Sequence, residues 1–390
     1  DESKTLFRLL KGFDHFGKNT EFRRLCENSS TWDSAEQEKL VCEMLNVGKI
    51  ATADNGKQSK VSQQIYKFYL FLFTVIENNI EEFLNHDVIH VIHDLCHKCN
   101  VEKVQLASVK LIHQLTEFTL GREHILNYAQ RNRCFIDELF KFLEKRNAIS
   151  RVVMGCINNL SLNEKFALEY FEHLDEITLS VLESCTISGS HNVDAKTQVA
   201  LASSSFATMA NLARVKEIKN KLQYNDQVWK LCVNVLTRYV DDVKRRDIGG
   251  MIYMELGLLV NISSDDSTCL QSHAISIAPF LLKLLSTEDL DLLKRVLGVL
   301  RLLMTYHEKV VKSVCTESSY EIFMDIIKRS SDDSTISYGV KCLALCSAKN
   351  IDAKTHISAN GVAIFHSLLS SSNETIVGNS ALILSNCFEQ

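Results

Sequence analysis

Proline and glycine are scarce in this sequence. One proline, Pro279, and 14 glycines occur in 390 residues. Sheets and long ordered loops need these residues at their turns, so their scarcity argues against a β-rich fold. The composition therefore favours a nearly all-helical protein.

The sequence also lacks an excess of positive charge and a long apolar run. The formal net charge is −5, whereas a nucleic-acid-binding domain is typically strongly basic. The longest apolar candidate, IYKFYLFLFTVI at 65–76, is too short to cross a bilayer and contains Lys67. We therefore expect neither a nucleic-acid partner nor a membrane partner.

A disulfide framework is not indicated either. The 13 cysteines are an odd number and lack tight spacing. Several lie within apolar helical runs, where free cysteine behaves as a small core residue. This usage suits a reducing compartment, so we expect the cytoplasm, with the nucleus as the alternative.

No nucleotide-binding or nucleophile motif occurs in the sequence. Cys96 and Cys99 form a lone CxxC, without the βαβ context that a redox motif needs. The sequence therefore predicts a protein that is not an enzyme and that has no cofactor.

What the sequence does contain is a repeat marked by asparagine. Four similar segments, CINNLS, MANLA, LVNIS and LSNCF, contain the candidates Asn159, Asn211, Asn261 and Asn386. If Leu302 and Leu345 occupy the same position in two further units, successive steps are 52, 50, 41, 43 and 41 residues. Gln114 and Thr74 continue the series upstream. A period near 42 with helical content is typical of armadillo and HEAT arrays.

The segment ISANGVAIFHSLLSSSNETIVGNSALILSNC at 357–387 resembles an armadillo repeat. Gly361 interrupts the chain before an amphipathic helix, and a polar turn then leads into a longer helix that ends in the asparagine. Residues 276–305 repeat this pattern, and Pro279 is expected to open the first helix there. The resemblance implies an all-α, armadillo/HEAT-like right-handed α-solenoid with three helices per repeat.

We expect this array to cover residues 62–390 in about seven or eight repeats, the last one truncated or capping the end. Residues 1–61 are expected to form a helical N-terminal cap or a divergent repeat. Polar stretches at 185–198 and 238–250 account for the two long steps and are expected to extend turns at the edge of the stack.

The family resemblance assigns a role to the asparagines. In armadillo proteins the last helix of each repeat carries an asparagine whose amide hydrogen-bonds the backbone of an extended partner. Carried over by position, the candidate groove residues are Asn159, Asn211, Asn261 and Asn386, with Gln114 as a longer version. The alternative is that each amide caps a neighbouring turn or links adjacent repeats without a ligand.

Residues one and two turns before each asparagine project on the same helix face. Gly155 and Gly257 are expected to leave room for a partner backbone, while Arg151 and Tyr253 are expected to contact partner side chains. The chain has only Trp32 and Trp229, so the regular Trp–Asn ladder of nuclear-import receptors is missing. This counts against recognition of basic localisation signals.

A histidine stripe is the remaining candidate site. His86, His90, His93 and His97 are spaced so that they share a narrow arc of one helix, which is expected to face water. A solvated helix face is one interpretation. A zinc site and a charge switch near neutral pH are the alternatives.

Two functions follow. The first is a non-catalytic protein-binding scaffold that captures an extended or helical partner segment in its concave groove. The alternative is a chaperone-type assembly factor that holds immature clients and works with heat-shock chaperones. The final repeat resembles that of assembly factors for axonemal dyneins, a family that joins a tetratricopeptide domain to an armadillo half.

Overall fold

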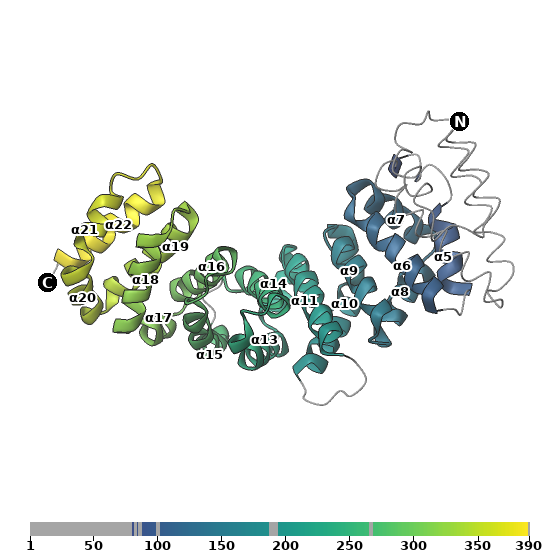
Figure 1. Cartoon of the computed structure of the whole chain (residues 1–390), viewed down its shortest axis with the longest axis horizontal. Coiled ribbons are helices and arrows are strands. Elements are labelled where there is room, and N and C mark those ends of the chain that lie inside the picture. Colours follow the sequence, from purple (N-terminus) through teal and green to yellow (C-terminus); the bar gives the residue numbers. More distant parts are fainter. Residues whose placement is uncertain are drawn as a thin grey trace, which may run out of the picture. The chain divides into compact units, whose positions relative to one another are not determined.

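The computed structural model describes residues 80–81, 84, 88–98, 102–186, 194–264 and 268–388. Within these ranges the chain forms 18 α-helices, one short 3-10 helix and no strand (Figure 1). This confirms the all-α solenoid predicted from the sequence. None of the described helices is long and apolar enough to cross a bilayer. The predicted boundary at residue 61 and the repeat containing Thr74 lie outside the described residues.

The chain divides into two compact units, with the division between Phe166 and Ala167. The described helices of unit 1 are α5 (Val88–Lys98), α6 (Glu102–Glu117), α7 (Thr119–Arg131), α8 (Cys134–Glu144) and α9 (Ala148–Leu160). Here α7, α8 and α9 form one three-helix repeat, and α9 packs against α6, the last helix of the repeat before it.

Unit 2 contains the remaining helices, since all but the first three residues of α10 belong to it. They are α10 (Glu164–Thr186), α11 (Ala195–Leu212), α12 (Lys216–Gln223), α13 (Asp226–Tyr239), η2 (Val240–Asp242), α14 (Arg246–Ile262), α15 (Thr268–Leu284), α16 (Leu290–Tyr306), α17 (Glu308–Val314), α18 (Glu317–Arg329), α19 (Asp333–Lys349), α20 (Ile351–Asn360), α21 (Val362–Leu368) and α22 (Glu374–Phe388).

The last helices of unit 2 pack against one another in chain order: α11 on α14, α14 on α16, α16 on α19 and α19 on α22. A second layer is made by α13, α15, α17 and α18, and α14, α16 and α19 lie along the opposite edge from α13, α15 and α17 (Figure 1). In each unit we call the surface made by the last helices the last-helix face: α6 and α9 make it in unit 1, and α11, α14, α16, α19 and α22 make it in unit 2.

Asparagine and aspartate set where several helices begin. The Asn147 side chain accepts hydrogen bonds from the backbone N–H groups of Ile149 and Ser150, and the Asn147 backbone N–H donates to Ser150 Oγ. This reciprocal capping satisfies N–H groups that have no partner inside α9. Asp289 and Asp332 cap α16 and α19 in the simpler one-sided way.

The expectation that Pro279 opens a helix is wrong. Pro279 lies inside α15, which runs without a break from Thr268 to Leu284. Its ring has no N–H to donate to the carbonyl one turn back and crowds that carbonyl, so the helix continues past Pro279 at a local cost. The first two helices of this repeat are therefore fused, and the repeat has two helices instead of three.

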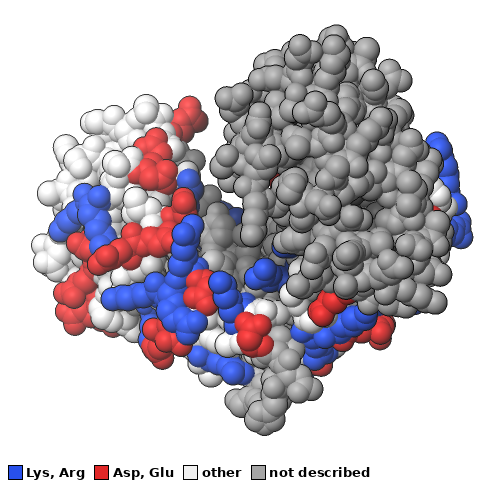
Figure 2. Space-filling view, turned by 45° about the vertical axis from the view of Figure 1, so that its right-hand side comes forward, with Lys and Arg blue, Asp and Glu red and all other residues white. Residues whose placement is uncertain are grey.

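The two polar stretches behave differently. The stretch at 185–198 separates α10 from α11, although residues 187–193 lie outside the described part. The stretch at 238–250 is mostly helical, since α13 ends at Tyr239 and α14 begins at Arg246. Charges of both signs are interspersed on the described surface that Figure 2 shows.

An unpaired acid lies in the core of the described part of the chain. Glu255 of α14 is fully buried, and neither carboxyl oxygen has a hydrogen-bond partner within the described structure. Burial raises the pKa of Glu255 well above its usual value. The folded protein therefore holds a neutral carboxyl where the unfolded chain has a charged one.

This gives a pH prediction. Above the ordinary pKa of glutamate the folded state keeps a proton that the unfolded state releases, so stability falls as pH rises. The slope is about 1.4 kcal/mol per pH unit until the raised pKa is passed. We expect Glu255→Met to remove this loss, so that its urea midpoint exceeds the parent's by a gap that widens from pH 5 to pH 8.

The matched control is Glu217→Met, which replaces an exposed carboxylate on α12. Its urea midpoint should follow the parent's at every pH. Parallel profiles for the parent and Glu255→Met would contradict the burial argument.

Candidate functional site: the last-helix face

The repeat positions found in the sequence fall near the C-terminal ends of the last helices. Gln114 is on α6 and Asn159 on α9 in unit 1. In unit 2 the corresponding residues are Asn211, Asn261, Leu302, Leu345 and Asn386, on α11, α14, α16, α19 and α22. The structure thus places each described candidate at the predicted position within its repeat.

Three of the asparagines bond to the neighbouring repeat. Asn159 Nδ2 donates to Thr116 Oγ1 at 3.0 Å, and Asn386 Nδ2 donates to Ser347 Oγ at 3.0 Å. Asn261 Nδ2 donates to the backbone oxygen of Ala210 at 2.8 Å. In each case the acceptor belongs to the last helix of the preceding repeat, so the amide N–H ties successive last helices together.

The hydroxyl acceptors are themselves held in place. Thr116 Oγ1 donates to the backbone oxygen of His113, and Ser347 Oγ donates to that of Ala344. Each hydroxyl lies two residues beyond the repeat position of its own helix and presents its oxygen to the next helix. The sequence contained this signal, because a hydroxyl precedes Asn159 by 43 residues and Asn386 by 39.

The amide oxygens differ in accessibility. Asn159 and Asn261 are half-buried, and within the described structure no hydrogen bond reaches the Oδ1 of either. Asn386 is 9% exposed and Gln114 is 8% exposed, so both side chains lie almost wholly inside the stack. Asn211 is half-buried. The polar positions are therefore not equivalent as partner contacts.

One repeat has the hydroxyl without the asparagine. Ser263 follows Asn261 by two residues, as Thr116 follows Gln114, and its buried Oγ has no hydrogen-bond partner in the described part. The next last helix, α16, has Leu302 at the corresponding position instead of an amide. The leucine thus coincides with an unpaired hydroxyl on the helix before it.

The space above the two glycines is already filled. A Cβ on Gly257 would lie 2.2 Å from Arg295 Nη1, and one on Gly155 would lie 2.7 Å from the His113 ring. These glycines therefore admit side chains from the adjacent repeat, where we had expected room for a partner backbone. The desolvation of His113 in this position lowers its pKa.

Tyr253 is paired with the arginine that covers Gly257. The Arg295 guanidinium lies 3.6 Å from the centre of the Tyr253 ring, and its Nη1 donates to the Tyr253 backbone oxygen at 2.9 Å. A second such pair follows along unit 2, where Arg301 lies 4.9 Å from the centre of the Tyr338 ring. These cation–π pairs join α16 to α14 on one side and to α19 on the other. The spacing of repeat positions did not reveal them.

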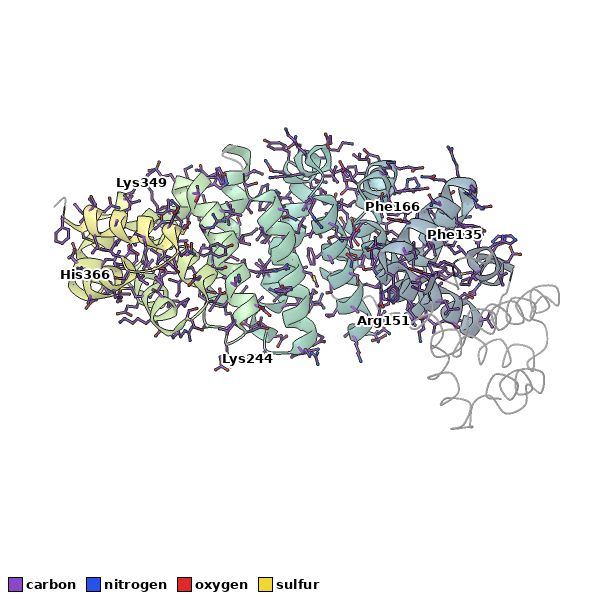
Figure 3. The ribbon with its side chains drawn as sticks, turned by 90° about the horizontal axis from the view of Figure 1, so that it is seen from above. Phe135, Arg151, Phe166, Lys244, Lys349 and His366 are labelled. Atoms are coloured by element: carbon purple, nitrogen blue, oxygen red, sulfur yellow. The ribbon has the colours of Figure 1, made fainter. Side chains whose placement is uncertain are left out.

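Charged residues gather where α14 begins. A cavity of about 700 Å³ there is lined by Lys244, Arg246, Lys283, Asp289 and Asp291, with Tyr253 among its walls. Lys244 lies at the edge of the face where α14 begins, and Lys349 lies at the opposite edge where α19 ends (Figure 3). In unit 1, Arg151 is exposed near the start of α9.

The histidine stripe departs from expectation at one residue. His90 and His97 are exposed, but His93 is buried beneath Tyr128 and Phe135. The helix α7 packs against α5 and covers part of the arc that we expected to face water. His86 lies outside the described residues.

These features define a helical-repeat scaffold of the armadillo-like class. No protein-family model matches the chain. Over 391 residues it is 25% identical to tetratricopeptide repeat protein 12 of Homo sapiens, a match covering 99% of this chain and 50% of that protein. The Mus musculus protein of the same name is 21% identical over 290 residues, covering 73% of this chain and 40% of that protein. The chain thus spans half or less of the length of these curated relatives.

One solved structure shows the same kind of fold, and a second is reported beside it. An engineered protein solved by the Northeast Structural Genomics Consortium matches 100% of this chain and 99% of its own, with a TM-score of 0.59 and 13% identity. A designed armadillo repeat protein, YIII(Dq)4CqI, matches 64% of this chain and 99% of its own, with a TM-score of 0.49 and 14% identity.

The bond between Asn386 and Ser347 can be tested directly. Asn386→Ala removes the donor and leaves a buried hydroxyl without it, so we expect a loss of about 1–2 kcal/mol in the free energy of unfolding. A double-mutant cycle with Ser347→Ala should give a coupling energy of about 1 kcal/mol. Urea unfolding followed by circular dichroism provides the measurement.

Asn379→Ala is the control on the same helix, because the Asn379 amide donates only to the Thr375 backbone within α22. It should change stability by less than about 0.5 kcal/mol. Additive effects of the Asn386 and Ser347 variants would show that the bond does not stabilise the stack.

The unpaired Ser263 hydroxyl gives a second test. Leu302→Asn should place an amide opposite it, although the loss of a half-buried leucine has its own cost. The cycle with Ser263→Ala isolates the new bond, and we expect a favourable coupling of about 1 kcal/mol. A coupling near zero would show that α16 and α14 do not bring these two positions within bonding distance.

Proposed function

We propose that this chain is a non-catalytic protein-binding scaffold whose last-helix face captures a segment of a partner protein. The observation that carries the proposal is how the side-chain amides of Asn159 and Asn261 are hydrogen-bonded. Their N–H groups are used between repeats, while their half-buried oxygens have no internal bond. Such an oxygen can accept a hydrogen bond from a partner backbone N–H without reading the partner's sequence.

The use of one amide hydrogen between repeats has a consequence for binding. An amide that is already tied to its neighbour cannot rotate freely, so it loses little conformational freedom when a partner docks. Asn211, half-buried at the same position of α11, is also assigned to partner binding. Gln114 and Asn386 contribute to the stack itself because they are almost fully buried.

Specificity would come from side chains near these amides. In unit 2 the Tyr253 ring is held by Arg295 and borders the cavity lined by Lys244 and Arg246. In unit 1 the exposed Arg151 offers a guanidinium to an acidic or polar partner side chain. Tyrosine and arginine are enriched among residues that dominate binding energy.

The second candidate function is a chaperone-type assembly factor, working with heat-shock chaperones on subunits of a motor such as axonemal dynein. It is favoured by the similarity to tetratricopeptide repeat protein 12 along 99% of the chain. The two functions use the same face and differ in the client, which is a native segment in the first and an immature subunit in the second. Both place the chain in a reducing compartment, the cytoplasm or the nucleus, and the described cysteines are free thiols.

The scaffold proposal is tested by selecting binders from a displayed library of random peptides with the purified chain. For peptides that bind, Tyr253→Ala or Arg151→Ala should weaken the affinity at least about tenfold, or about 1.4 kcal/mol. Calorimetry or fluorescence anisotropy measures the change.

Tyr224→Ala is the matched control, because Tyr224 is a 51% exposed tyrosine at the end of α12, outside the last-helix face. Arg131→Ala, at the end of α7, is the control for Arg151. If the control variants weaken binding as much as the face variants, the last-helix face is not the binding site. If no peptide binds but the chain suppresses aggregation of a thermally unfolded client, the assembly-factor function is favoured.

A further inference from the structure

Unit 1 contains a mixed cluster of metal-binding side chains that the scaffold function does not use. His93 of α5 and Cys134 and Glu138 of α8 bring one nitrogen, one sulfur and one oxygen within 4.8 Å of one another, the one such group among the described residues. Phe135, labelled in Figure 3, marks its place on α8. The cluster differs from the histidine stripe, since two of its three members come from another helix.

The geometry brings the donors together at one point. His93 Nε2 is 2.9 Å from Glu138 Oε2, and His97 Nδ1 is 2.8 Å from Glu138 Oε1. Cys134 and Glu138 are one turn apart on α8, and His93 and His97 are one turn apart on α5, so each helix offers two donors on one face. Both histidines thus approach the Glu138 carboxylate. The Cys134 sulfur lies within 4.8 Å of the ligand atoms of His93 and Glu138.

The ring of His93 is held with its Nε2 toward the cluster. Phe135 packs edge-on against it at 5.0 Å between ring centres, and Tyr128 does so at 5.7 Å. The Tyr128 hydroxyl lies 2.8 Å from His93 Nδ1. When Nδ1 donates to this oxygen, Nε2 presents a lone pair to the cluster, which is the arrangement that orients histidine ligands in metal sites.

We infer that His93, Cys134 and Glu138 form a binding site for a divalent transition-metal ion, with zinc as the favoured ion. Thiolate, imidazole and carboxylate are together the ligand set that zinc uses, whereas magnesium and calcium take oxygen ligands. In a tetrahedral zinc site neighbouring donor atoms lie about 3.3–3.5 Å apart. The donors, which lie within 4.8 Å of one another, would close by up to about 1.5 Å, while His93 Nε2 and Glu138 Oε2, now 2.9 Å apart, would separate slightly. His97 is not one of the three ligands. It lies 2.8 Å from the second oxygen of Glu138 and holds that carboxylate in place.

The ion would tie α5 to α8. Because a folded site binds the ion and an unfolded chain lacks the site, zinc would raise the stability of unit 1 by mass action. This role is separate from the last-helix face and does not depend on the proposed function.

The test uses the full chain after treatment with a chelator, titrated with Co²⁺ alone and then with Zn²⁺ alone. We expect one Co²⁺ per chain to give a thiolate-to-cobalt charge-transfer band and the strong visible bands of a tetrahedral site. Zn²⁺ should abolish these bands and raise the thermal midpoint.

Cys134→Ser replaces an exposed side chain and should keep the fold while removing the charge-transfer band. Glu138→Gln and His93→Gln should weaken Zn²⁺ binding at least about tenfold. Cys315→Ser and Asp137→Asn are the matched controls, a thiol in unit 2 and the exposed carboxylate beside Glu138, and both should bind as the parent does.

The inference is overturned if the parent shows no charge-transfer band at one equivalent of Co²⁺, or if the band survives Cys134→Ser. It is also overturned if Zn²⁺ leaves the thermal midpoint of the parent unchanged. Any of these three results would leave the cluster as a hydrogen-bonded network around Glu138, and a band that survives Cys134→Ser would place the cobalt on another thiol.

Discussion

The stacking of last helices on one another is the constraint on which the rest of this structure depends. Each last helix must bury one side against the helix before it, and the asparagine near its end directs an amide N–H onto that neighbour. The bonds from Asn159, Asn261 and Asn386 all run backward along the chain to the preceding repeat. The same position in these three repeats thus supplies one hydrogen bond between successive last helices.

Under the proposed function, the same position also serves binding where the amide oxygen remains accessible. An amide has separate donor and acceptor groups, so it can link repeats with one and meet a partner with the other. Linking repeats and binding a partner, which the sequence left as alternatives, are therefore compatible at Asn159 and Asn261. At Asn386, which is almost wholly buried, the structural bond dominates. Between these positions Leu302 and Leu345 interrupt the series, and the guanidinium–tyrosine pairs of Arg295 and Arg301 join the helices there.

The sequence predicted what depends on periodicity. The repeat near 42 residues located the last helices, and Asn159, Asn211, Asn261 and Asn386 were placed at corresponding positions. It failed where a contact between distant residues decides the outcome. It also failed at Pro279, because α15 continues through this residue although a proline usually opens or breaks a helix. His93 shares its arc with exposed histidines but is covered by Tyr128 and Phe135, from helices that follow much later. Gly155 and Gly257 leave room for the His113 and Arg295 side chains that lie above them, and local spacing cannot show this contact.

The most direct measurement is a crystal structure of the chain bound to a peptide selected for affinity. We expect the peptide on the last-helix face, with its backbone N–H groups donating to the Oδ1 atoms of Asn159 or Asn261. The Nδ2 atoms of the same residues should remain bonded to Thr116 and to the Ala210 backbone. A peptide seated on the layer of α13 and α15, or amides rotated away from their neighbours to reach it, would contradict the account.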